Sequence, residues 1–184
     1  ASFLFGSPEL YALADDNPRF RLRRTEVTND PASISANPGM VSVNTALQVD
    51  LFAQVNASRV HGRTYSGFGG QTDFIVGALH SVGGQAIIAL RSWHPRADVS
   101  SIVPVVEQPV TSFQASAIIT EQGVAEIGGR TDVEQARQLI AHAAHPSARE
   151  ELCDRAAELG LLTPGSAACS TRAPLPAFAA PVRS

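Results

Sequence analysis

A cluster of three glycines between two apolar stretches constrains the fold of this chain more than any other feature. Gly67, Gly69 and Gly70 lie within residues 65–74, which also hold the carboxylate Asp73. Glycine lets the backbone adopt a positive φ and leaves its N–H open to another molecule, because it has no Cβ. The cluster therefore predicts a tight turn or bulge between regular elements, or a loop whose N–H groups bind an oxyanion.

The glycine cluster does not match the common nucleotide-binding motifs. Its spacing differs from G-x-G-x-x-G, and no Lys-Ser or Lys-Thr pair follows it, as a phosphate-binding P-loop requires. Dinucleotide and nucleoside-triphosphate binding therefore receive little support. A serine hydrolase would be expected to carry G-x-S-x-G, and Ser66 lacks the first glycine of that motif. Ser66 is therefore a poor candidate nucleophile.

Length and charge limit the number of domains and the kinds of partner. At 184 residues the chain is long enough for one domain with a substantial core. A formal net charge of -3 gives no general electrostatic reason to bind nucleic acid or an anionic membrane. The basic cluster at residues 19–24 is interleaved with Phe20 and Leu22 and is interpreted as a strand with one solvated face. Since no stretch approaches the roughly 18 apolar residues of a membrane span, we expect a cytoplasmic protein without nucleic-acid or membrane partners.

Apolar runs in the first two thirds of the chain indicate a sheet-rich centre. A helix is expected to begin at Ser7 and Pro8, because a hydroxyl cap and a proline in the first turn favour a helix start. A short strand is expected next, over residues 20–27. Residues 40–51 alternate apolar and polar side chains, which predicts a half-buried strand that can bend at residues 44–45. Further strands are predicted at residues 54–60, 85–90, 102–106 and 117–120, and a short helix at residues 74–79.

The last third of the chain carries helical signals, followed by a change in composition. Capping boxes at residues 131–134 and 147–150 each precede a helical apolar pattern, and Gly160 is expected to stop the second helix. Residues 163–184 are rich in Pro, Ala, Gly and Ser, which predicts a disordered or surface-draped tail. The whole pattern predicts one α/β domain over residues 1–162, in which helices flank a mixed sheet.

Several titratable side chains could carry chemistry, but each has a simpler structural interpretation. His142 and His145 could share a helix face, yet no acid or cysteine partner can be assigned to them, so we expect no metal site. Burial could raise the pKa of four carboxylates for acid–base chemistry, although capping or hydrogen bonding would also explain them: Asp50, Asp73, Glu121 and Glu126. For Asp73 the sequence favours a helix N-terminal cap, and for Glu121 the ordering of a loop.

A series of short motifs runs along most of the chain. They are FLFGS from Phe3, VTNDP from Val27, MVSVN from Met40, YSGFGGQTDF from Tyr65, IVP from Ile102, ITE from Ile119, GVA from Gly123 and AHP from Ala144. In the order of these motifs, over about residues 3–162, the chain resembles the C-terminal domain of the acetyl-CoA hydrolase and 4-hydroxybutyrate CoA-transferase family, the class I CoA-transferases. Together the motifs are far more specific than any one alone.

The resemblance implies a CoA-transferase-like fold and a covalent reaction. Such enzymes transfer CoA from an acyl-CoA to a small carboxylic acid, or hydrolyse acetyl-CoA, through a glutamate that attacks the thioester. Each addition creates an oxyanion, which preorganised N–H groups stabilise. By resemblance, Gly69 and Gly70 form the oxyanion loop, with the Gly70 N–H as donor, and Asn29 orients the substrate carboxylate. The residues implied in binding CoA or substrate are Gly67, Phe68, Gln71, Asp73 and Phe74. Residues 92–96 depart from the family's pattern, and there Arg96 is expected to compensate in part as a phosphate ligand.

The resemblance also implies a component that this chain lacks. In the family the nucleophilic glutamate lies just before the region matched here, and no residue of this chain matches it. The chain is therefore expected to be the C-terminal half of a longer enzyme, or a subunit completed by another chain, and to be inactive alone. The expected partners are an N-terminal CoA-transferase domain or complementary subunit and, in a homo-oligomer, further copies. The alternative is a non-catalytic CoA-binding or regulatory module that keeps the fold.

Overall fold

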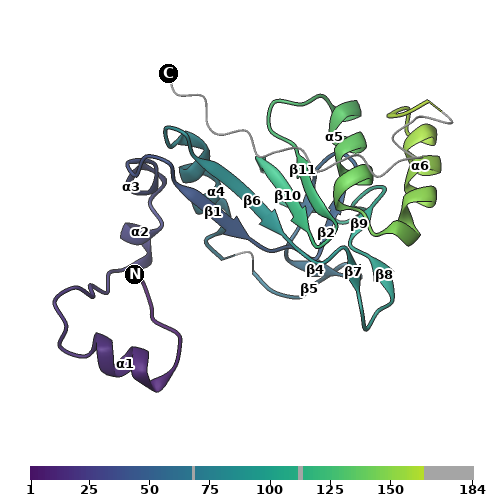
Figure 1. Ribbon diagram of the computed structural model, residues 1–184. Helices are drawn as coiled ribbons and strands as arrows, with labels where there is room; N and C mark the ends of the chain where they lie inside the picture. The colour runs from purple at the N-terminus through teal and green to yellow at the C-terminus, as the bar shows by residue number, and fades with distance from the viewer. Residues whose placement is uncertain (68, 112–113, 164–184) are drawn as a thin grey trace.

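A mixed four-stranded sheet forms the centre of the molecule, with its strands in the order β1-β6-β10-β11 (Figure 1). The computed structural model describes residues 1–67, 69–111 and 114–163. The parallel strands are β1 (Val41–Asn44), β6 (Gln85–Ala89) and β10 (Ala117–Thr120), and β11 (Gly123–Glu126) pairs antiparallel with β10. The expected α/β fold with a mixed sheet is therefore confirmed.

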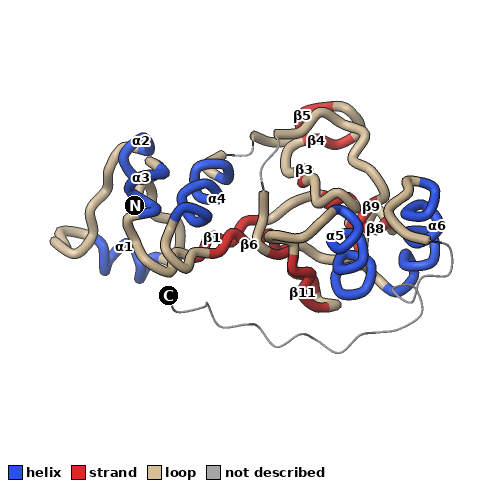
Figure 2. The backbone as a smooth tube through the Cα atoms, turned by 90° about the horizontal axis from the view of Figure 1, so that it is seen from above, coloured by secondary structure: helices blue, strands red, loops and turns tan. Residues whose placement is uncertain are grey.

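One face of this sheet carries the main hydrophobic core. Ile88, Ile118 and Ala125 are cross-strand partners, so their side chains share a face, and all three are fully buried. Ile75 and Leu139 join the same core from two helical segments that lie on one side of the strands (Figure 2). Burying each large side chain stabilises the fold by about 1.5–3 kcal/mol. The helical segments are α4 (Gln71–His80), and α5 (Asp132–Gln138) continued by the π-helix η1 (Leu139–Ala143).

The remaining strands form smaller sheets, and two of the strands predicted from the sequence are each observed as two shorter strands. The chain leaves the central sheet after Asn44, so the strand predicted over residues 40–51 becomes two strands in separate sheets. The strand predicted over residues 54–60 is likewise divided in two. A period-two pattern marks strand-like residues but does not show which sheet they join. These strands are β2 (Gln48–Asp50), β3 (Val55–Asn56) and β9 (Ile102–Val103) in one sheet, β4 (Arg59–Val60) with β5 (Arg63–Thr64), and β7 (Trp93–His94) with β8 (Val99–Ser100).

The N-terminal segment extends away from the central sheet (Figure 1). Its first helix begins at the predicted proline, Pro8, and buries none of its residues. The strand predicted over residues 20–27 is wrong, because residues 20–24 form no strand and a helix begins at Thr25. The main chain of Ala1 hydrogen-bonds on both sides of Leu22, but a single residue is too short an edge to complete a strand. The helices here are α1 (Pro8–Ala14), α2 (Thr25–Thr28) and α3 (Pro31–Ser35).

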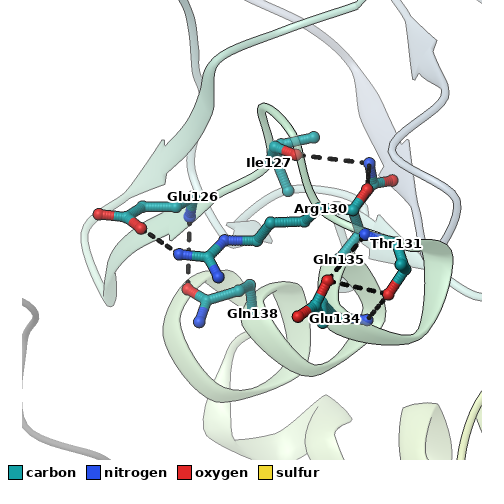
Figure 3. A network of polar contacts seen from close by, with 7 residues as sticks. All are labelled: Glu126, Ile127, Arg130, Thr131, Glu134, Gln135 and Gln138. Atoms are coloured by element: carbon teal, nitrogen blue, oxygen red, sulfur yellow. Dashed lines mark hydrogen bonds and ion pairs between the residues drawn. The ribbon is translucent and has the colours of Figure 1, made fainter.

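The C-terminal helices follow the sequence signals in part. Thr131 and Glu134 form the predicted capping box of α5 (Figure 3). The second predicted box is wrong, because the N-cap residue of the last helix is Ala148, which offers no side-chain acceptor. That helix is α6 (Arg149–Glu158), and it follows the 3-10 turn η2 (Pro146–Ala148). From residue 164 on, the predicted tail lies outside the described residues. In the described part of the chain, the helices are too short or too polar to cross a membrane.

Candidate active site

A cleft of about 750 Å³ lies beside β1, which is an edge strand of the central sheet. Its walls come from the first residues of the chain, the α2–α3 region, β1 and the start of α4. Four residues that the sequence assigned to the site line it together: Asn29, Gly70, Gln71 and Phe74. The other lining residues are Ala1, Ser2, Phe3, Val27, Thr28, Ser33, Ile34, Asn37, Met40 and Asn44.

The first turn of α4 lies where the parallel strand β1 ends. Gln71 is buried, and its Nε2 donates a hydrogen bond to the carbonyl oxygen of Thr45, 3.3 Å away and one residue beyond β1. In open α/β sheets, ligands bind at the carboxyl ends of the parallel strands. The cleft is lined by Met40 and Asn44, so it runs beside β1 and reaches this end of the strand.

The glycine loop leaves its N–H groups available. Gly69 adopts a φ of 57°, in the left-handed region that favours glycine, and Gly70 follows as the N-cap residue of α4. Within the described residues, the N–H groups of Gly69 and Gly70 find no hydrogen-bond acceptor. The N-terminus of a helix also carries a partial positive charge. An anionic oxygen in the cleft beside Gly70 would therefore meet a free donor and a favourable field.

The side chain of Asn29 is held against Gly70. A Cβ atom added to Gly70 would lie 2.4 Å from Nδ2 of Asn29, so only glycine leaves room for this amide. Oδ1 of Asn29 accepts a hydrogen bond from Oγ1 of Thr28 at 3.0 Å. The next residue, Asp30, caps α3 with its carboxylate. Asn29 is therefore fixed at the junction of α2 and α3, with its amide beside the glycine loop.

The described lining of the cleft contains no charged side chain. It offers amides, hydroxyl groups, main-chain N–H groups and apolar surface, none of which is a carboxylate. Among the described residues there is also no group of three or more His, Cys, Asp or Glu side chains that could hold a metal ion. The cleft can therefore orient a polar group and stabilise a developing negative charge, but its described walls do not supply a carboxylate nucleophile.

Other residues assigned to the site from sequence lie elsewhere. Gly67, Gly69 and Asp73 flank or follow the glycine turn without lining the cleft. The prediction that Asp73 caps α4 is wrong, because Gly70 is the N-cap residue and α4 has no side-chain cap. Arg96 lies between β7 and β8, a hairpin far from α4 in both overall views. Phe68 lies outside the described residues.

Asp50, considered for acid–base chemistry, has a structural role instead. Its side chain is buried and lies outside the lining of the cleft. One carboxylate oxygen accepts from the N–H groups of Phe52 and Gln54 at 3.0 and 2.9 Å, and the other accepts from Val106 N–H at 2.9 Å. Burial raises the pKa of Asp50, and the three donors oppose that rise. The carboxylate joins the β2–β3 turn to the segment after β9.

The remaining titratable candidates also lie outside the cleft lining. Glu121 orders the loop after β6, as expected, by accepting hydrogen bonds from the N–H and hydroxyl of Ser92. Partial burial pushes the pKa of Glu121 up, but the hydrogen bonds from Ser92 outweigh this and lower the pKa to about 2. Glu126 pairs with Arg130 (Figure 3), and burial lowers the pKa of His142.

Sequence reasoning missed most of the polar lining of the cleft. Thr28 could have been found, because it precedes Asn29 in the same motif and its hydroxyl is within reach of that amide. Asn44 could have been found in the same way, because it ends the motif MVSVN, whereas Asn37 lies in no such motif and its place depends on β1 being at the sheet edge. Strand order is a property of the whole chain and cannot be read from a local pattern.

The chain is similar to proteins of one known family over most of its length. Residues 6–156 match the family described as acetyl-CoA hydrolase/transferase C-terminal domain. A 4-hydroxybutyrate coenzyme A transferase from Clostridium kluyveri is 40% identical over 155 residues, which make up 82% of this chain and 36% of that protein. An acetyl-CoA hydrolase from Kluyveromyces lactis is 32% identical over 142 residues, 76% of this chain and 27% of that protein.

A solved structure is similar over the same region. The crystal structure of RipA from Yersinia pestis matches with a TM-score of 0.78 and 37% identity, over 85% of this chain and 36% of that one. The chain thus spans about a third of the length of the proteins it matches. Because the family match covers most of the chain, this chain belongs to the acetyl-CoA hydrolase/transferase C-terminal domain family.

Proposed function

We propose that this chain, over residues 1–162, is the C-terminal part of an acyl-CoA:carboxylate CoA-transferase or of an acetyl-CoA hydrolase. The observation that carries the proposal is the cleft in which Asn29, Gly70, Gln71 and Phe74 meet, although Asn29 is far from the other three in sequence. The named activities of relatives that share the family support the same chemistry.

The proposed role of the cleft is to hold the carbonyl group that reacts. When a carboxylate attacks the thioester of an acyl-CoA, the carbonyl oxygen becomes an oxyanion and the C–S bond then breaks to release the CoA thiolate. The free N–H of Gly70, at the positive end of α4, is the proposed donor to that oxyanion. Losing one such donor typically costs on the order of 10²- to 10³-fold in rate. The Asn29 amide would orient the substrate carboxylate beside the same point.

The attacking carboxylate is proposed to come from an N-terminal part or a second subunit. The described lining of the cleft has no carboxylate of its own, and the matched residues make up only 36% of the 4-hydroxybutyrate coenzyme A transferase. The CoA thiolate would attack the glutamyl carbonyl of the resulting acyl-glutamyl anhydride, which gives a glutamyl thioester and releases the first carboxylate so that an acceptor carboxylate can take up CoA. Alternatively, water would hydrolyse the intermediate and free the glutamate. Exclusion of water by the complete site therefore decides between transferase and hydrolase.

An assay of the complete natural protein that contains these residues tests the proposal. We expect CoA to pass from acetyl-CoA to short carboxylic acids, or acetyl-CoA to be hydrolysed, and Asn29→Ala to reduce either rate on the order of tenfold or more. Binding of CoA without turnover would support a non-catalytic CoA-binding module instead. A complete protein that neither binds CoA nor turns over acetyl-CoA would refute both the enzyme and the CoA-binding module.

A further inference from the structure

The cleft can hold the reactive end of an acyl-CoA but lacks groups suited to its other end. The nucleotide end of CoA carries a diphosphate bridge and a 3′-phosphate, which need cationic partners. None of the described lining residues has a charged side chain. If the proposed function holds, on which this inference rests, a separate basic surface beside the cleft is required.

An arginine row borders the first wall of the cleft. We use this name for Arg19, Arg21 and Arg23, which alternate with Phe20 and Leu22. The main-chain nitrogen of Ala1 donates to the carbonyl oxygen of Arg21 at 3.1 Å, and the Arg23 N–H donates to the Ala1 carbonyl oxygen at 2.9 Å. Ala1 itself lines the cleft. The main chain of the row is therefore in direct contact with the cleft wall.

The chain leads from the row straight into the site. Arg23 is followed by Arg24 and then by α2, whose last residues line the cleft with Asn29. Residues 21–24 form no helix or strand, and Arg24 has an extended backbone. Leu22 lines another cavity with Leu4 and Tyr11, whereas Arg21 and Arg23 do not line it.

The side chains of the row are available for a ligand. All three are exposed, and none forms an ion pair with a described residue. Their neighbour Arg24 is different, because it pairs with Glu26. Guanidinium groups bind phosphate through paired N–H donors and stay charged at any physiological pH.

Other basic groups are less well placed. Arg59 on the β4–β5 hairpin already donates to the carbonyl oxygen of Gly62, and the described residues of that hairpin do not line the cleft. Arg96, expected from the sequence to bind phosphate, lies on the remote β7–β8 hairpin. We propose that the arginine row binds the phosphates at the nucleotide end of CoA, while the pantetheine arm passes along the wall to Gly70.

The test compares substrates with and without the nucleotide. In the complete natural protein, Arg21→Gln/Arg23→Gln should raise the KM for acetyl-CoA on the order of tenfold, while kcat/KM for acetyl-pantetheine stays unchanged. The control is Arg137→Gln, which removes one arginine charge from an exposed position on α5 outside the cleft lining. It should leave both substrates unaffected. For the unaltered protein, salt should raise the KM for acetyl-CoA more than that for acetyl-pantetheine.

The outcomes separate this inference from the proposed function. Transfer or hydrolysis by the unaltered protein, with an unchanged KM for acetyl-CoA in the double variant, would overturn the inference and leave the proposed function standing. Equal losses on both substrates would also overturn it, because they would indicate a structural role of the row. Absence of CoA binding and turnover in the unaltered protein would refute the proposed function itself.

Discussion

At the scale of single residues, Gly70 and Asn29 act on the cleft as a pair. Gly70→Ala keeps the N–H donor but places a methyl group 2.4 Å from Nδ2 of Asn29, so the amide must move. In the complete natural protein we expect kcat/KM to fall on the order of 10- to 100-fold for Gly70→Ala and for Asn29→Ala. The double variant should be no slower than Asn29→Ala, because both changes remove one contact.

A second glycine provides the control for this pair. A Cβ atom on Gly128 would meet its nearest neighbour, the Cα of Ser116, at 3.5 Å, an ordinary contact far from the cleft lining. Gly128→Ala should therefore leave turnover close to that of the unaltered protein. If the fold-decrease in kcat/KM of the double variant equals the product of the two single decreases, Gly70 and Asn29 act independently. That result would contradict the proposed coupling.

The buried carboxylate of Asp50 makes a prediction about stability. In Asp50→Asn the amide NH2 group must replace a carboxylate oxygen that accepts from Phe52, Gln54 or Val106, so at least one buried donor loses its acceptor. We expect the free energy of unfolding to fall by about 1–3 kcal/mol in urea titrations. Asp98→Asn is the control, because its exposed carbonyl can still accept from Trp93, and it should change stability by less than about 0.5 kcal/mol. Equal effects at both positions would contradict the structural role of Asp50.

At the scale of elements, the two sequence-predicted capping boxes give opposite expectations. Thr131 accepts from the N–H of Glu134 at the start of α5, so Thr131→Ala should lower the free energy of unfolding by about 1 kcal/mol. Ser147 does not cap α6, whose N-cap residue is Ala148, so Ser147→Ala should have an effect below about 0.5 kcal/mol. Urea unfolding of both variants measures the difference. A larger loss for Ser147→Ala would favour the prediction from sequence over the structure.

The link between the β10–β11 turn and the loop after β6 depends on pH. The pKa of Glu121, about 2 against an ordinary 4.5, means that its ionised form is favoured by folding. Its contribution is fully present above about pH 4.5 and is lost as the pH falls through about 2. Because the side chain is exposed, we expect only on the order of 1 kcal/mol. The stability difference between the unaltered protein and Glu121→Gln should therefore shrink between about pH 6 and about pH 3. A difference independent of pH would contradict this assignment.

At the scale of the whole molecule, local sequence signals predicted single helices and strands well, but they did not predict which of these elements contact one another. The apolar runs of β6 and β10, the start of α1 and the capping box of α5 were read from residues close in sequence. The strand predicted over residues 20–27 failed because no strand of the described residues pairs with this segment. The glycine motif and Asn29 were each recognised, but their contact depends on α3 packing against α4 at Gly77, where a Cβ would lie 2.5 Å from Cγ2 of Ile34. Such packing has no local pattern.

Under the proposed function, the lack of charged side chains in the wall beside β1 determines which copies of the protein can consume acyl-CoA. A surface that steadies the reacting carbonyl but brings no attacking group can fold without splitting the thioesters it meets. Acyl-CoA would then react only where this part and the part that supplies the carboxylate are assembled. Newly made or unassembled copies would therefore not hydrolyse the cell's acyl-CoA.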